Sequence, residues 1–180
     1  LYEGKNLDTV SQAEQLASYG AQIVADYPKY TAANAMVEAA ERLTRESSNS
    51  QQYLLLLGGL RALSGSEHEG SQVLDSYLLR ALSLSGWVPE LGSCHSCQSD
   101  NPRSFSVHTG HVSCADCALA GAVKLGNAGL LHMRNLLSGN WTEVAQTPPA
   151  TKSNVSNVIS AYLQWQLERG LRSMSMVERA

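Results

Sequence analysis

Four cysteines constrain the fold of this 180-residue chain more than any other feature. They are Cys94, Cys97, Cys114 and Cys117, so two Cys-x2-Cys pairs are separated by sixteen residues. Two residues between cysteines let a tight turn direct both sulfurs to one point, and two such turns complete a tetrahedral thiolate shell. Disulfides would suit an exported protein and a redox pair would open a helix beside a parallel sheet, but the sequence shows neither context. We expect one structural zinc ion, because four thiolates leave no open position for water.

Three histidines lie near the cysteines in the sequence and are alternative ligands. They are His95, His108 and His111. With four cysteines at this spacing, we expect these imidazoles to lie at the surface or around the ligands rather than on the metal. Apolar and polar residues alternate over 105–107 and 111–112 around Thr109 and Gly110, which predicts a short hairpin that returns the second cysteine pair to the first.

Hydrophobic periodicity predicts helices on both sides of the cysteines. Ser11 with Glu14 forms a capping box that starts the first helix, and Pro28 is expected to end it. The expected helices span residues 11–27, 51–63, 71–85, 128–138 and 154–169, and a further helix between the first two is capped by Thr31. The helix over residues 51–63, third in order, is expected to be central because its sequence is so apolar. The predicted fold is mainly α: a helical bundle over residues 11–180, with a four-cysteine zinc module over residues 91–121 inserted within it.

The charge balance differs between the two halves of the chain. The net charge is −3, but residues 1–100 carry six basic and twelve acidic side chains, whereas residues 101–180 carry seven and four. The basic residues of the second half are the only electrostatic basis for contact with phosphates. Alternatively, they pair with carboxylates or face solvent. The candidates for DNA contact are Lys124, Arg134, Lys152, Arg169 and Arg172, the last two sharing a face if the final helix continues.

Motifs typical of enzymes and membrane spans are missing from the sequence. It contains neither Gly-x-Ser-x-Gly nor Gly-x4-Gly-Lys-Ser/Thr. Glu38 and Glu41 are one helical turn apart among arginines, which is typical of a solvated face. The longest apolar run, residues 54–60, is far shorter than the ~20 residues that cross a bilayer. We expect a protein that is not an enzyme and has no membrane partner.

Several segments together resemble the RecO family of bacterial recombination and repair proteins. They are residues 4–14 (GKNLDTVSQAE), 30–38 (YTAANAMVE), the Leu91-x2-Cys94-x2-Cys97 motif, and residues 162–173 (YLQWQLERGLRS). The resemblance implies that residues 1–10 are the end of an N-terminal OB-fold, most of which precedes this sequence. An OB-fold groove commonly binds single strands.

The resemblance also implies a function. The chain would be a recombination mediator that binds single- and double-stranded DNA and anneals complementary strands. With RecR it would help to load RecA onto strands coated by single-strand-binding protein, whose C-terminal tail is a further partner. It would act in the bacterial cytoplasm, at the nucleoid. The alternative is a zinc-stapled helical interaction module that binds no nucleic acid; phosphate-dependent, salt-sensitive binding distinguishes the two.

Overall fold

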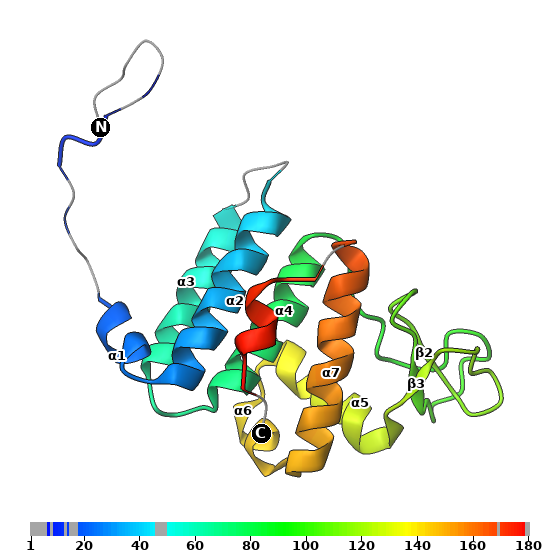
Figure 1. Cartoon of the computed structure of the whole chain (residues 1–180). Coiled ribbons are helices and arrows are strands. Elements are labelled where there is room, and N and C mark those ends of the chain that lie inside the picture. Colours follow the sequence, from blue (N-terminus) through cyan, green and yellow to red (C-terminus); the bar gives the residue numbers. More distant parts are fainter. Residues whose placement is uncertain are drawn as a thin grey trace.

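The protein is a helical bundle with a small β-sheet at one side (Figure 1). The computed structural model describes residues 7, 9–12, 14, 18–45, 50–168 and 170–178. The described elements are α1 (Gly20–Val24), α2 (Tyr27–Leu43), α3 (Ser50–Ser64), α4 (Gly70–Leu84), β1 (Ser104–Phe105), β2 (Val112–Ser113), β3 (Val123–Lys124), α5 (Gly126–Ser138), α6 (Trp141–Gln146), α7 (Pro149–Gln166) and a 3-10 helix, η1 (Ser173–Met176). The mainly α prediction is confirmed. The predicted end of an OB-fold falls largely outside the described residues.

Helix α4 forms the centre of the bundle. It packs against α2, α3, α5 and α7, and ten of its fifteen residues are buried. The expectation that the third helix is central was wrong. In α3 only Gln52 and Leu63 are buried, while Tyr53 and Leu54 are 65% and 62% exposed. An apolar run shows that side chains are hydrophobic but not how many other elements cover them. Periodicity alone therefore could not show that α4, and not α3, is central.

The first predicted helix differs most from the structure. Ser11 and Glu14 are not helical, and α1 is only five residues long. Pro28 does not end a helix but lies in the first turn of α2, where its missing N–H costs nothing. Asp26 is the cap of α2, because its side chain accepts a hydrogen bond from the Lys29 N–H at 3.1 Å. Thr31, the expected cap, lies inside the helix.

The last helices form the other half of the bundle. Gly139 ends α5 as expected, with a left-handed φ of 76° that glycine adopts readily. Helix α7 begins at Pro149, five residues before the expected start at residue 154, and ends at Gln166 rather than near residue 169. Helix α6 was not predicted. No helix in the described part of the chain is long and apolar enough to span a membrane.

The sheet docks onto the helices rather than standing apart from them. Its strand order is β2-β1-β3, antiparallel throughout, so the predicted hairpin of β1 and β2 is confirmed and β3 is added to it. Phe105 is fully buried and meets Tyr162 of α7 edge to face, with ring centroids 5.4 Å apart. A Cβ at Gly110 would lie 2.6 Å from the Tyr162 hydroxyl oxygen, so this approach requires glycine. The sheet therefore has a defined position against α7.

Candidate metal centre and surrounding surface

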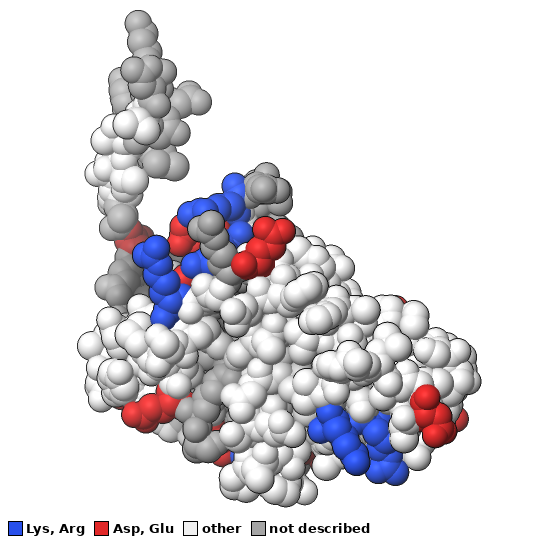
Figure 2. Space-filling view, turned by 45° about the vertical axis from the view of Figure 1, so that its right-hand side comes forward, with Lys and Arg blue, Asp and Glu red and all other residues white. Residues whose placement is uncertain are grey.

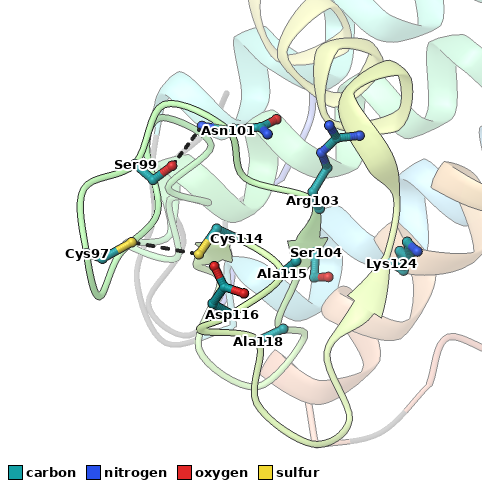
Figure 3. A pocket seen from close by; sticks show the side chains of 10 residues that line it. All are labelled: Cys97, Ser99, Asn101, Arg103, Ser104, Cys114, Ala115, Asp116, Ala118 and Lys124. Carbon is teal, nitrogen blue, oxygen red and sulfur yellow. Dashed lines mark hydrogen bonds between the residues drawn. The ribbon is translucent and has the colours of Figure 1, made fainter.

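The four cysteine sulfurs converge beside the sheet. Their Sγ atoms all lie within 4.8 Å of one another, and those of Cys97 and Cys114 are 3.7 Å apart (Figure 3). A tetrahedron of thiolates with metal–sulfur bonds of about 2.3 Å has edges of about 3.8 Å. All four cysteines are described and none forms a disulfide. The sulfurs are thus spaced for a single tetrahedral metal ion.

Backbone geometry brings the two cysteine pairs together. Each pair brackets a turn, at residues 95–97 and 115–117, and Cys114 directly follows β2. The N–H of Gln98 donates to the Cys94 carbonyl at 2.8 Å, with Gln98 at a left-handed φ of 61°. The N–H of His95 donates to the Val112 carbonyl at 3.0 Å, which joins the first turn to β2. The hairpin register therefore fixes the second pair opposite the first.

The crowded sulfurs carry opposing pKa shifts. Backbone N–H groups of Cys114 and Cys97 point at the Cys94 sulfur and lower its pKa to about 6. Hydrogen bonding with the Cys114 and Cys97 sulfurs is the main cause that raises the pKa of Cys117 to about 12, and repulsion between neighbouring thiolates adds to it. One thiolate is favoured and full ionisation is opposed. A divalent cation among the sulfurs would remove that repulsion.

None of the histidines near the cysteines belongs to the sulfur cluster. The His108 ring stacks on Trp165 of α7 at a centroid distance of 4.1 Å. His95 and His111 instead lie close to Glu90. Glu90 belongs to the segment before the first cysteine and forms a β-bridge with His111. The sequence spacing placed all three histidines near the metal but could not show that His108 has different neighbours from His95 and His111.

A cleft of about 600 Å³ opens beside the sulfurs (Figure 3). Arg103 and Lys124 both line it and are exposed, and Lys124 of β3 pairs with Ser104, the residue after Arg103. Neither forms an ion pair within the described part of the chain. Arg103 was not among the DNA-contact candidates that the sequence suggested. The lining residues are Cys97, Ser99, Asn101, Arg103, Ser104, Cys114, Ala115, Asp116, Ala118 and Lys124.

Two of the candidate DNA-contact residues are held in internal contacts. Arg134 of α5 donates from Nε to the Leu91 carbonyl at 2.6 Å and from its terminal nitrogen to the Gly92 carbonyl at 3.1 Å. Lys152 of α7 is buried, and its Nζ donates to Glu69 at 2.8 Å. Both side chains tie separate segments of the fold together. Contact with phosphates would require them to leave these partners.

The remaining two candidates lie beyond the last helix. Arg169 is outside the described residues, and Arg172 is exposed but not helical, so the expected shared helix face is not formed. The Arg172 N–H donates to Glu38 at 2.9 Å, and Ser173 donates to it from N at 2.8 Å and from Oγ at 2.5 Å. Burial of Glu38 opposes its ionisation, but these hydrogen bonds prevail and lower its pKa to about 2. Glu38 anchors the C-terminal segment instead of facing solvent.

Charge is spread unevenly over the surface. On the face drawn in Figure 2, basic and acidic side chains occur together in two areas, separated by a wide uncharged surface. A second cleft contains both signs, with Glu38, Glu41 and Glu168 against Arg42, Arg45 and Arg172. This balance agrees with the modest net charge of the sequence. Exposed cations that form no ion pair with described residues, such as Lys124, are therefore the better candidates for contact with phosphates.

Comparison with known proteins identifies the family. Residues 24–175 match the family described as Recombination protein O C terminal. The chain is 43% identical over 183 residues to the DNA repair protein RecO of Thermobifida fusca, covering 100% of this chain and 75% of that relative. It is 44% identical over 179 residues to the DNA repair protein RecO of Streptomyces avermitilis, covering 98% of this chain and 72% of that relative. The fold, the cysteine cluster and these similarities agree, and the chain belongs to the RecO family of DNA repair proteins.

Proposed function

We propose that this protein is a non-catalytic mediator of recombinational repair that binds single- and double-stranded DNA and anneals complementary strands. With RecR, it would help to load RecA onto strands coated by single-strand-binding protein. The observation that carries this proposal is the family match over residues 24–175, supported by relatives named as DNA repair proteins over nearly the whole chain. These roles require docking surfaces and a metal-held module rather than a reaction centre.

The metal at the cysteine cluster is proposed to be zinc, one ion per chain, bound by Cys94, Cys97, Cys114 and Cys117. Tetrahedral thiolate sites hold zinc or iron. The 3.7 Å separation of two sulfurs equals the edge of a tetrahedron around one ion, whereas a multi-iron cluster holds its cysteines farther apart. With all four positions filled by sulfur, the ion has a structural role: it joins the two turns.

The proposed DNA contacts within this chain come from exposed basic side chains. Lys124 and Arg103 line one cleft, and neither forms an ion pair with an acidic side chain among the described residues. Asp116 lines the same cleft, and four thiolates with one zinc add a charge of about −2, so phosphates would approach from the Arg103 and Lys124 side. Arg172, with Arg169 close to it in sequence, is the second proposed contact. Arg134 and Lys152 are weaker candidates because their present bonds would be lost.

A groove between α3 and α4 is proposed to bind the acidic-hydrophobic tail of single-strand-binding protein. The groove has a volume of about 260 Å³, and its single charged lining residue is the cation Arg80. The hydroxyl of Tyr77, which also lines it, is buried without a hydrogen-bond partner among the described residues. Apolar walls with one cation suit a peptide that combines apolar side chains with carboxylates. The apolar walls are formed by Leu54, Leu55, Ala62, Val73 and Trp141.

A peptide titration tests the groove. Leu54 is 62% exposed at its edge, so Leu54→Glu places a like charge beside the acidic peptide without disturbing the core. We expect a fluorescein-labelled tail peptide to bind the native chain and to lose at least about tenfold in affinity to this variant. Val37→Glu, at an exposed position of α2 outside the groove, is the matched control. Equal affinity for all three proteins would exclude the groove as the dock.

Strand annealing tests the proposed function itself. Complementary oligonucleotides carrying a fluorophore and a quencher, coated with single-strand-binding protein, should pair faster in the presence of the chain. The increase should fall at high salt, because phosphate contacts release counterions. Annealing at the uncatalysed rate, together with salt-independent or absent DNA binding, would instead support an interaction module that binds no nucleic acid.

A further inference from the structure

A second group of metal-ligating side chains lies outside the cysteine cluster. It consists of Glu90, His95 and His111, whose ligand atoms all lie within 4.8 Å of one another. His95 Nδ1 is 3.4 Å from Glu90 Oε2, and His111 Nε2 is 3.8 Å from the same oxygen. We propose that these three residues form a second, exchangeable site for a divalent transition-metal ion such as Zn²⁺, separate from the structural one.

The spacing of the three ligand atoms matches a coordination sphere. Zinc bonds to imidazole nitrogen and carboxylate oxygen of about 2.0–2.1 Å give tetrahedral edges of about 3.4 Å. The two nitrogen–oxygen separations are at that value and slightly above it. The imidazole rings lie 3.8 Å apart between centroids and are tilted by 48°. Each places a ring nitrogen within 4 Å of the same carboxylate oxygen. Small rotations of the exposed Glu90 and His95 side chains and the partly buried His111 would close the sphere.

The backbone holds the three ligands in place. Glu90 and His111 form a parallel β-bridge, and the Glu90 N–H donates to the Gly110 carbonyl at 2.8 Å. The His95 N–H donates to the Val112 carbonyl at 3.0 Å, so all three Cα positions are fixed to the same hairpin. A site whose ligands are placed by backbone pairing loses little entropy when it takes up an ion.

The kinds of ligand atom determine which ions the site binds, and the exposure of the ligands determines whether the ion can exchange. Two imidazoles and one carboxylate favour zinc, cobalt, nickel or copper over magnesium and calcium, which prefer oxygen ligands. Three protein ligands leave one position for water or an oxygen donor from another molecule. The side chains of Glu90 and His95 are 62% and 57% exposed, so the ion can enter and leave. This openness distinguishes the site from the sulfur cluster.

Cobalt titration of the intact chain, purified with its resident metal, tests the proposal. Co²⁺ is paramagnetic and broadens the ring-proton resonances of the imidazoles that bind it. We expect His95 and His111 to broaden with up to one equivalent of Co²⁺, while His108 does not. His111→Asn and Glu90→Gln should each weaken Co²⁺ binding at least about tenfold. His108→Asn, in the same module but stacked on Trp165, should leave it unchanged.

Three results would overturn the proposal. The first is equal broadening of all exposed histidines, which indicates non-specific binding. The second is unchanged affinity in both ligand variants, provided that helical circular dichroism shows them folded. The third is thiolate-to-cobalt charge-transfer absorption with release of the resident metal, which would place Co²⁺ at the cysteines. In each case Glu90 with the two imidazoles would be only a polar surface contact.

Discussion

Several charged side chains in this protein join segments that are far apart in the sequence. Arg134 reaches from α5 to the carbonyls of Leu91 and Gly92, just before the first cysteine. Glu38 reaches from α2 to the backbone of residues 172 and 173. Hydrogen bonds with an ionised partner contribute more to stability than hydrogen bonds between neutral groups. Arg134 and Glu38 therefore stabilise the fold itself.

Arg134→Ala should loosen the entry to the cysteine module. Two hydrogen bonds from a guanidinium to carbonyls are lost, which should cost about 1–2 kcal/mol of the free energy of unfolding. Amide hydrogen exchange should accelerate over residues 90–94, and urea unfolding should give the change in stability. Arg45→Ala, which removes only an exposed ion pair with Glu41, should cost less than about 0.5 kcal/mol. Equal effects of the two variants would contradict this role.

Glu38 should make the anchoring of the C-terminal segment dependent on pH. Its pKa is about 2 in the folded chain, below the ordinary 4.5, so the folded state favours the carboxylate. That stabilisation is fully present above about pH 4.5 and is lost as the pH falls toward 2. Glu38→Gln should cost about 1–2 kcal/mol at pH 7, and the difference from the native chain should shrink by pH 3.

Urea unfolding at both pH values measures this difference. Glu41→Gln is the matched control, because Glu41 lies one turn away and has only an exposed partner. It should leave the stability almost unchanged at either pH. A Glu38→Gln deficit that stays constant from pH 7 to pH 3 would mean that the carboxylate charge does not hold the segment.

At the scale of elements, the sequence predicted which segments are helical better than where they end. Apolar spacing along α4 and α5 is a local signal, and their predicted bounds, 71–85 and 128–138, lie within two residues of the observed ones. Pro28 was misassigned because proline fits both the end of one helix and the first turn of the next. The cysteine spacing predicted the sulfur cluster, since two turns and a hairpin suffice to form it. The cluster of Glu90, His95 and His111 was missed because its residues converge only through backbone pairing.

Loss of the metal centre should loosen one module and spare the helices. The core cluster draws most of its residues from the helices, whereas the sheet module contributes Leu91, Phe105 and Val112. Cys94→Ser should therefore abolish the tight metal and speed hydrogen exchange over residues 91–121, with helical circular dichroism retained. Cooperative unfolding of the whole chain in this variant at room temperature would show that the metal holds the entire fold.

At the scale of the whole molecule, the arrangement depends on contacts that no local pattern reveals. Phe105 is buried against Tyr162 from a helix more than fifty residues later, and α3 leaves Tyr53 and Leu54 exposed because no described element covers them. The four described basic residues that looked alike in the sequence separate into internal ties, Arg134 and Lys152, and exposed cations, Lys124 and Arg172, for the same reason. Tertiary packing, not spacing, decides which charges remain available to a partner.

The measurement that tests the account most directly is a salt titration of DNA binding. Fluorescence anisotropy of a labelled single strand should give a linear fall of log K with log salt for the native chain. Arg103→Ala with Lys124→Ala should reduce that slope by up to ~1.4, and Arg172→Ala by up to ~0.7. Arg45→Ala, which also removes one positive charge but from an ion pair, should leave the slope unchanged. Binding that ignores salt, or slopes equal in all four proteins, would contradict the proposed DNA contacts of this chain.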